Sequence, residues 1–284
     1  TLFRSTIGLE NYNDFLSSYI HYNRSINEQY LNLTLEQKQA IFDKIQHQLA
    51  TEERNYQYKF IDNNCTTKIV DLLNEVLEKP IETQFEGNSD SQRKILNSSL
   101  TNHYFEKLGM NLLFGINVDK DNEKVFLPEK LMHSISNSTN GNQRLEQNDI
   151  SHYERIENSS KSNWNTIYFF SIICLILAFL SRIKFIQYIF FFSVGILGTV
   201  ILIVSLFTSH SELVWNESLL LFNPLYFFLG IKKFRNVITK ILGVSIILFL
   251  IIASFEKTLI VLPLLLLELF YLYQLLRKKI EKKV

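Results

Sequence analysis

Apolar residues are distributed unevenly along the chain, because nearly all of the long apolar runs lie in its second half. Most of these runs approach or exceed the ~17–25 residues that a helix needs to cross a bilayer. The third run is interrupted by polar residues and by Pro224. The pattern predicts an all-α transmembrane domain over residues 164–276, followed by a basic tail, 277–284. Its five predicted spans are residues 165–180, 185–207, 213–231, 237–255 and 258–276.

The first half carries shorter periodic segments, which predict a small mixed domain over residues 1–135. Thr34 and Gln37 fit a helix-capping box, and apolar residues follow them at helical spacing. Residues 56–60 alternate like a half-buried strand, and a second amphipathic helix follows them and stops before Pro80.

Residues 136–163 are rich in Asn, Ser and charged residues. A segment with so little apolar content buries too little surface to offset the entropy lost on ordering. We therefore predict a polar linker between the two domains.

Charge divides the chain at the same place. Residues 164–284 hold 12 Lys and Arg against 5 Asp and Glu, a net of +7, while residues 1–163 have a net of −6. A single soluble globular domain, a disulfide scaffold, a collagen-like chain and a disordered chain are all inconsistent with this pattern. Because the overall net charge is only +1 and basic residues cluster beside the apolar runs, we expect no nucleic-acid partner.

Basic residues also indicate how the chain crosses the membrane. They follow the first, third and fifth apolar runs, whereas the loops between the second and third runs and between the fourth and fifth hold almost none. Under the positive-inside rule these three clusters are cytoplasmic. Five crossings then place residues 1–163 outside the cytoplasm and the C-terminus inside it. The clusters are Arg182 and Lys184; Lys232, Lys233, Arg235 and Lys240; and Arg277, Lys278, Lys279, Lys282 and Lys283.

Cys65 is the strongest candidate for chemistry. The other cysteine, Cys174, lies in the first predicted span, where a thiol behaves as a small hydrophobic group. Cys65 instead belongs to a domain expected in an oxidising compartment, with no second extramembrane cysteine to pair with. Asn63 or Asn64 is a suitable N-cap, so Cys65 falls in the first turn of a helix, whose positive end favours a thiolate. A nucleophile and a buried structural cysteine both remain open.

A cysteine nucleophile needs a base, usually histidine. None of the histidines in the first half lies in a recognisable motif, and each is more typical of a structural or solvated residue. These histidines are His21, His47, His103, His133 and His152.

A polar cluster is expected at the outer end of the second and third spans, where His210, Asn216 and Asn223 occur beside Trp215. Polar groups at membrane depth are costly unless they have partners or a task. The cluster therefore either faces substrate or supports a helix kink at Pro224. Glu268, deep in the fifth span, is either a paired structural carboxylate or a substrate contact.

The segment Tyr56–Thr67, YQYKFIDNNCTT, resembles the Y-x-Y-x-F-x-x-x-N-C-[AT]-T segment of the Lnb-type bacterial lipoprotein N-acyltransferases. Weaker similarities cover most of the chain outside the linker. The resemblance implies an α+β extracytoplasmic domain of permuted papain-like (NlpC/P60-related) fold, incomplete here, joined to the membrane domain in the bacterial inner membrane. It also implies that Cys65 is catalytic, with Arg24, Tyr58, Asn63, Asn64 and Thr66 in support. The weaker similarities are at residues 22–29, 31–34, 108–115, 126–128, 210–216 and 219–225.

The implied reaction is acyl transfer from a phospholipid to Cys65 and then to the N-terminal amine of a lipoprotein, without a metal or cofactor. The family's histidine precedes its cysteine in a G-H-T-type segment, which is absent here, so we expect it upstream of Thr1 and expect this chain alone to be inactive. Two alternatives remain, namely a cysteine hydrolase or peptidase of the cell envelope and a non-enzymatic membrane protein for binding or transport.

Overall fold

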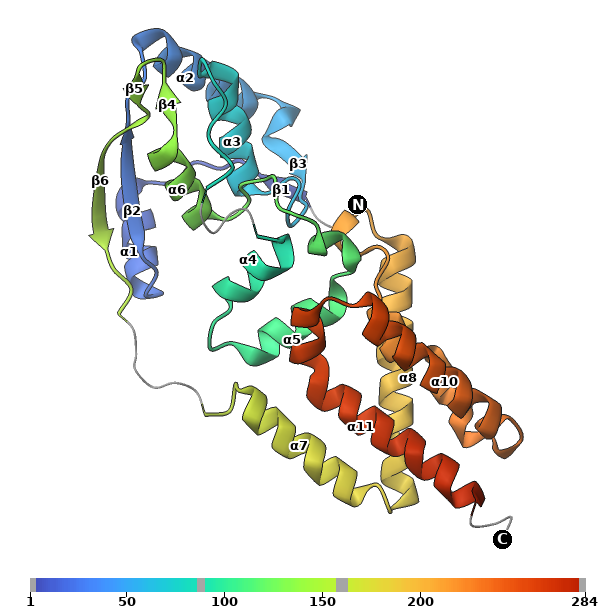
Figure 1. Ribbon diagram of the computed structural model, residues 1–284. Helices are drawn as coiled ribbons and strands as arrows, with labels where there is room; N and C mark the ends of the chain where they lie inside the picture. The colour runs from blue at the N-terminus through green and yellow to red at the C-terminus, as the bar shows by residue number, and fades with distance from the viewer. Residues whose placement is uncertain (1–3, 86–89, 157–162, 281–284) are drawn as a thin grey trace. The chain divides into compact units, whose positions relative to one another are not determined.

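The computed structural model describes residues 4–85, 90–156 and 163–280 (Figure 1). The chain forms two compact units. Unit 1 comprises Thr1–Asp90 and Asp121–Ser160, and unit 2 comprises Ser91–Lys120 and Lys161–Val284. Ser91–Lys120, which we predicted in the first domain, therefore packs with the membrane half of the chain.

Unit 1 combines helices with short antiparallel strands that pair two at a time, β1 with β3, β2 with β6 and β4 with β5. These separate pairs do not confirm the papain-like fold, which stays a prediction. The helices are α1 (Tyr12–His21), α2 (Leu35–Ala50), the 3-10 turn η1 (Glu52–Arg54), α3 (Cys65–Val76) and α6 (Pro128–Asn137). The strands are β1 (Arg4–Thr6), β2 (Ile26–Leu31), β3 (Asn55–Gln57), β4 (Thr139–Asn140), β5 (Gln143–Arg144) and β6 (Glu146–Tyr153).

Both predicted helices of unit 1 begin where the sequence indicates. At α2, Thr34 and Gln37 form the complete capping box. At α3 a second reciprocal box joins Asn64 to Thr67. The apolar face of α3 packs into the unit 1 core with residues of α6 and the β5–β6 connection. The buried members of that core are Leu73, Leu77, Ile81, Val125, Leu131, Ile135 and Leu145.

The prediction of a linker over residues 136–163 is wrong for most of its length. Residues 139–153 hold β4, β5 and β6, and β6 pairs with β2 from Ile26↔Tyr153 to Leu31↔Glu146 (Figure 1). Backbone hydrogen bonding to a distant strand orders this segment despite its polar side chains, and Leu145 is fully buried beside it. Residues 157–162 of the predicted linker lie outside the described residues.

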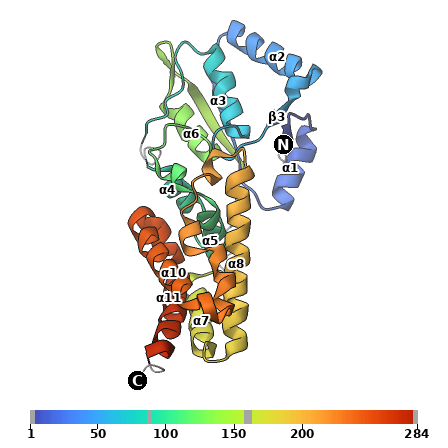
Figure 2. The ribbon, with the colours of Figure 1, turned by 90° about the vertical axis from the view of Figure 1, so that its right-hand side faces the viewer.

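Within its described residues, unit 2 has three helices long and apolar enough to cross a membrane, over Lys184–Phe207, Lys232–Ile252 and Phe255–Arg277. The first predicted span is a shorter apolar helix of 14 residues. Figure 2 shows α7, α8, α10 and α11 in a second view. The elements of unit 2 are α4 (Gln92–Ser99), α5 (Tyr104–Leu113), η2 (Ile116–Asp119), α7 (Ile167–Leu180), α8 (Lys184–Phe207), η3 (Ser211–Leu213), α9 (Ser218–Leu221), η4 (Pro224–Gly230), α10 (Lys232–Ile252) and α11 (Phe255–Ile280).

The third predicted span, residues 213–231, is not a continuous helix. After the last residue of η3 it contains two short helical pieces, α9 and η4. The two are separated because Pro224 cannot continue a helix, and Asn223 accepts a hydrogen bond from the Leu225 N–H at the break. Irregular backbone at membrane depth is tolerated where protein covers it. Here Gly198 of α8 lies so close to the Phe222 carbonyl that a Cβ atom would collide with it.

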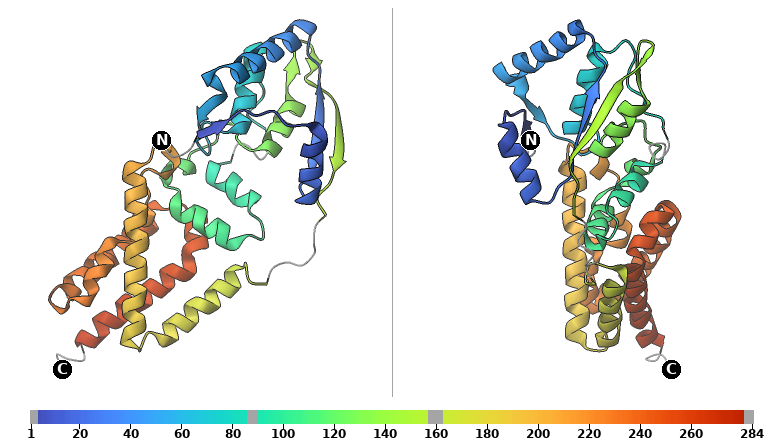
Figure 3. Two further views of the ribbon diagram at one scale, coloured as in Figure 1. Left: turned by 180° about the vertical axis from the view of Figure 1, so that it is seen from behind. Right: turned by 90° about the vertical axis from the view of Figure 1, so that its left-hand side faces the viewer.

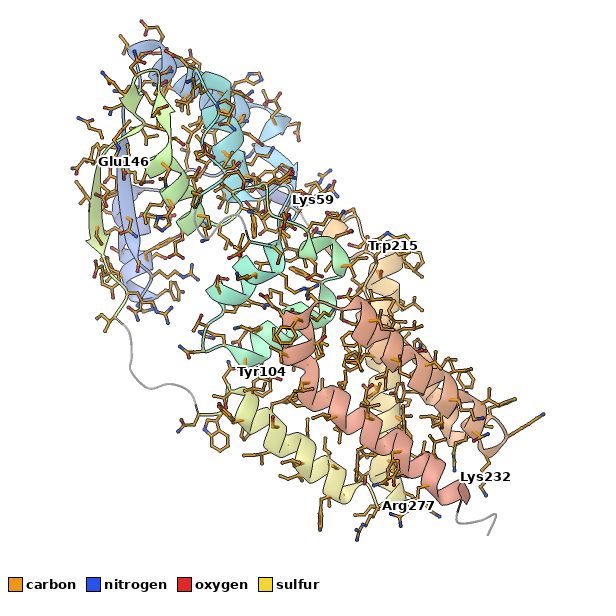
Figure 4. All side chains as sticks on the ribbon, viewed as in Figure 1. Lys59, Tyr104, Glu146, Trp215, Lys232 and Arg277 are labelled. Atoms are coloured by element: carbon orange, nitrogen blue, oxygen red, sulfur yellow. The ribbon has the colours of Figure 1, made fainter. Side chains whose placement is uncertain are left out.

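Basic residues gather toward one end of unit 2. Figure 4 shows Lys232 and Arg277 toward this end and Trp215 toward the other. The second basic cluster, which begins at Lys232, lies within α10 rather than in a loop, so this helix begins five residues before the predicted fourth span. Likewise α11 continues through Ile280 into the predicted basic tail, whose residues 281–284 lie outside the described part of the chain.

Candidate active site

Cys65 is the first residue of α3, and its side chain is exposed. The preceding residue, Asn64, caps the helix and is itself buried, with 5% of its surface exposed. The Asn64 Nδ2 donates to the carbonyls of Phe60 and Phe126, at 2.8 Å each, while its Oδ1 accepts from the Thr67 N–H at 2.9 Å. These three hydrogen bonds, together with the one that the Asn64 N–H donates to the Thr67 Oγ1, therefore fix the start of the helix that carries the Cys65 thiol.

The turn before Cys65 is held by the neighbours that the resemblance implied. Asn63 donates from Nδ2 to the Gln57 carbonyl at 2.7 Å, and its own carbonyl accepts from the Lys59 N–H at 2.9 Å. Thr66 is buried just inside α3, and the rings of Tyr58 and Phe60 meet edge to face in the turn. These contacts order the turn that precedes the cysteine.

Arg24 lies in a different environment. Its guanidinium sits over the rings of Tyr19 and Tyr22 at the end of α1, 5.8 and 5.7 Å from their centroids. Its backbone N–H donates to the Tyr19 carbonyl. These contacts order the connection from α1 to β2, and the structure does not group Arg24 with the residues of the cysteine turn.

Tyr56 lies near the cysteine and Lys68 lies near Tyr56, although no sequence motif singled out either residue. Burial raises the pKa of Tyr56, a hydrogen bond with Ser5 opposes that rise, and the neighbouring Cys65 adds to it. The Lys68 ammonium lies 5.5 Å from the centroid of the Tyr56 ring. Lys68 follows Cys65 by three positions, so helical periodicity alone could have placed both on one face of α3.

No histidine in the described ranges 4–85, 90–156 and 163–280 hydrogen bonds to Cys65. His47 instead lies 3.7 Å from Glu53, and His152 lies 2.6 Å from Glu28. The remaining candidates contact other residues: His21 packs against Tyr22, His103 lies near Glu106, and His133 packs against Phe85.

The predicted polar cluster of unit 2 separates into individual structural contacts. His210 is buried and lies 3.4 Å from Glu212, as measured from Nδ1 to Oε1. Asn216 is also buried and donates to the carbonyls at the C-terminal end of α5, Leu112 and Leu113. Asn223 caps η4, which is the kink interpretation that the sequence left open.

Arg93 is the centre of a buried charge network that sequence reasoning missed. Only 1% of its surface is exposed. Its guanidinium binds both carboxylate oxygens of Asp119, at 2.6 and 3.0 Å, and donates to the Asn111 Oδ1 at 2.9 Å. A further oxygen, Oε1 of Glu217, lies 3.6 Å away.

Lys257 completes this network from the start of α11. Its Nζ lies 2.7 Å from the Glu217 Oε1 and donates to the Phe114 carbonyl at 2.9 Å. Among the described residues, the other Glu217 oxygen, Oε2, and the Ser218 hydroxyl are buried without a hydrogen-bond partner. Buried charges are rarely signalled by sequence, because only packing decides which charged side chains lose contact with water.

Glu268 has a partner that the sequence could not name. The Tyr226 hydroxyl, from η4, donates to its Oε2 at 3.0 Å, and both side chains are fully buried. The structure thus pairs this carboxylate within unit 2.

Comparison with known proteins adds one result to this geometry. Residues 2–98 match the family model described as the Lnb N-terminal periplasmic domain. The match covers about a third of the chain and includes Cys65 with its turn. It supports the resemblance to Lnb-type lipoprotein N-acyltransferases. With three helices suited to cross a membrane, it indicates an inner-membrane protein with a periplasmic N-terminal domain. No curated protein and no solved structure matches the chain.

Proposed function

We propose that the protein is a thiol-dependent N-acyltransferase that moves an acyl chain from a phospholipid to the N-terminal amine of a lipoprotein. The observation that carries this proposal is the placement of Cys65. Its thiol is exposed at the first residue of α3, whose N-terminus is fixed by the reciprocal capping box of Asn64 and Thr67. This residue lies within the segment that matches the periplasmic domain family.

The chemistry follows from the residue type. The Cys65 thiol gives up its proton and the sulfur attacks the carbonyl carbon of a phospholipid ester; the C–O bond breaks, and the lysophospholipid leaves with that proton on its alcohol oxygen. The resulting thioester is attacked by the lipoprotein amine. Its C–S bond then breaks, the amide forms, and the proton released from nitrogen returns the thiol to its starting state.

The N-terminus of α3 favours this sequence of steps. The backbone N–H groups of its first turn and the positive end of its dipole stabilise negative charge on the Cys65 sulfur. Asn64 contributes by position, since its side chain is committed to Thr67, Phe60 and Phe126. Tyr56 offers a phenol near the thiol, and the Lys68 ammonium lies over the Tyr56 ring.

The membrane unit suits the proposed substrates. Both the phospholipid and the diacylglyceryl group of a lipoprotein reside in a bilayer, so an enzyme that uses both gains from a membrane anchor. We propose that unit 1 is periplasmic and the C-terminus cytoplasmic, as the distribution of Lys and Arg favours. The proposal depends on Cys65 rather than on His210, Asn216 and Asn223, whose contacts hold the polypeptide together.

The decisive experiment replaces Cys65 with Ser in the full-length protein. In cells whose lipoprotein N-acylation depends on this protein, mass spectrometry of a lipoprotein N-terminal peptide measures the product. We expect Cys65→Ser to lower N-acylation by at least ~10²-fold, because a hydroxyl is essentially un-ionised near neutral pH. Cys174→Ala, which alters the buried membrane thiol, is the matched control and should retain activity.

Two outcomes would contradict the proposal. Normal N-acylation by Cys65→Ser would exclude a thioester at this residue. Cys65-dependent release of fatty acid or cleavage of cell-wall peptide, without an acylated lipoprotein, would instead establish a cysteine hydrolase.

A further inference from the structure

A cavity of about 540 Å³ opens between α7 and α11 in unit 2. The two helices lie side by side in Figure 1 and in the reversed view of Figure 3. Arg277 and Lys232, both labelled in Figure 4, lie at the same end of unit 2. The cavity volume falls in the range of about 300–1,000 Å³ that small-molecule sites occupy.

The lining of this cavity has a basic, polar part and an apolar part. Arg182 and Arg277 supply two guanidinium groups, Gln274 supplies an amide, and the lining residues include no acidic side chain. Phe179 and Phe270 form an apolar wall beside them. A ligand that fits both parts must combine a negative charge with a hydrophobic tail.

The walls are fixed by contacts between the helices. The Gln274 Nε2 donates to the Ser181 Oγ at 2.7 Å, and its Oε1 accepts from Gln187 at 3.3 Å. The Tyr271 hydroxyl donates to the Leu177 carbonyl at 3.0 Å. These bonds hold the C-terminal ends of α7 and α11 together and preorganise the cavity.

We propose that this cavity binds an anionic glycerophospholipid of the membrane. Arg182 and Arg277 bind its phosphate, since a guanidinium matches phosphate oxygens in a bidentate arrangement. The acyl chain follows Phe179 and Phe270. Basic pockets between transmembrane helices on the positive side of a membrane protein are suited to such headgroups.

This site differs from the proposed acyl donor site in place and residues. It belongs to the end of unit 2 that is rich in Lys and Arg, and it uses no residue of the Cys65 region. The proposal therefore stands independently of the acyl-transfer reaction.

The test measures lipid selectivity of the purified full chain. The protein is exchanged into nanodiscs of phosphatidylglycerol and phosphatidylcholine in equal amounts, then released into mild detergent, and the retained lipid is quantified by mass spectrometry. We expect the unaltered protein to retain phosphatidylglycerol preferentially. Arg182→Gln with Arg277→Gln should lower this preference on the order of tenfold, since each basic residue near the lipid contributes to headgroup binding.

A matched control removes the same charge elsewhere at this end. Lys184→Gln with Lys240→Gln changes two exposed basic residues that do not line the cavity, and it should keep the preference. Equal loss in both double variants would show diffuse attraction and overturn the site. An unaltered protein without phosphatidylglycerol preference would also overturn it.

A charge-conserving variant covers the case in which the glutamine variant fails to fold. Arg182→Lys with Arg277→Lys keeps both positive charges but loses the bidentate geometry, so its preference should fall below that of the unaltered protein. Full retention by this lysine variant would exclude guanidinium recognition, leaving ordinary boundary lipid as the explanation.

Discussion

Lys257→Met tests whether the buried charge network holds unit 2 together. The lysine is fully buried, 2.7 Å from the Glu217 carboxylate and 2.9 Å from the Phe114 carbonyl. Methionine keeps the length of the side chain but removes both interactions. Glu217 then retains only Arg93 as a charged neighbour, at 3.6 Å, and its second oxygen already has no partner among the described residues.

We expect Lys257→Met to lower the free energy of unfolding substantially, because the Glu217 carboxylate stays buried without the lysine that compensates its charge. Breaking a buried ion pair from one side typically costs about 3–5 kcal/mol. Lys44→Met is the matched control, since Lys44 lies 3.1 Å from Glu75 but both side chains are more than a third exposed. Exposed pairs contribute about 0–1 kcal/mol.

Thermal unfolding of the full chain in detergent, followed by far-UV circular dichroism for both units and by tryptophan fluorescence for unit 2, measures the difference. Trp215 lies two residues before Glu217 and therefore reports on unit 2. We expect Lys257→Met to lower the apparent Tm on the order of 10 °C and Lys44→Met to lower it by a few degrees at most.

A double variant separates the network from simple packing. Glu217→Gln combined with Lys257→Met removes the stranded charge and should recover part of the loss. The reasoning is refuted if Lys257→Met shifts Tm no more than Lys44→Met, or if the double variant loses the sum of its two single losses.

Two further predictions follow from local geometry. Gly115→Ala should lower the Tm of unit 2, because the new Cβ would collide with the carbonyl oxygens of Val214 and Trp215, the latter at 2.7 Å. Gly109→Ala in α5 is the control: its Cβ meets no atom within 4 Å, so it should leave the Tm unchanged or raise it. Equal Tm shifts for the two variants in the same melting assay would contradict this. Hydrogen bonds, first from Gln29 and then from Ser136, lower the pKa of Glu146 in the folded protein. The ionised carboxylate therefore stabilises the fold above its unfolded pKa of about 4.3, and this stabilisation is lost as the pH falls through the lower folded pKa. Urea unfolding between about pH 3 and 7 should therefore show unit 1 weakening on acidification, and an unchanged pH profile in Glu146→Gln would exclude this carboxylate as a source.

The sequence by itself determined the local features of this protein. Capping residues such as Thr34 and Asn64 act within a few positions, so the starts of α2 and α3 could be read directly. Long apolar runs likewise identified the three membrane-length helices, since bilayer thickness sets their length. The cysteine turn was identified because its residues are contiguous.

Tertiary structure decided whatever depends on partners distant in the chain. The polar residues of β6 are ordered only by pairing with β2, more than a hundred positions earlier, so composition alone suggested a linker. Pro224 marks a break in the third apolar run, but the close packing of the broken segment against α8, where Gly198 meets the Phe222 carbonyl, involves residues distant in the chain. Arg93, Glu217 and Lys257 come from three separate segments and carry no common motif. Only folding brings such charges together, because the interactions that compensate their loss of hydration exist only once the segments have packed.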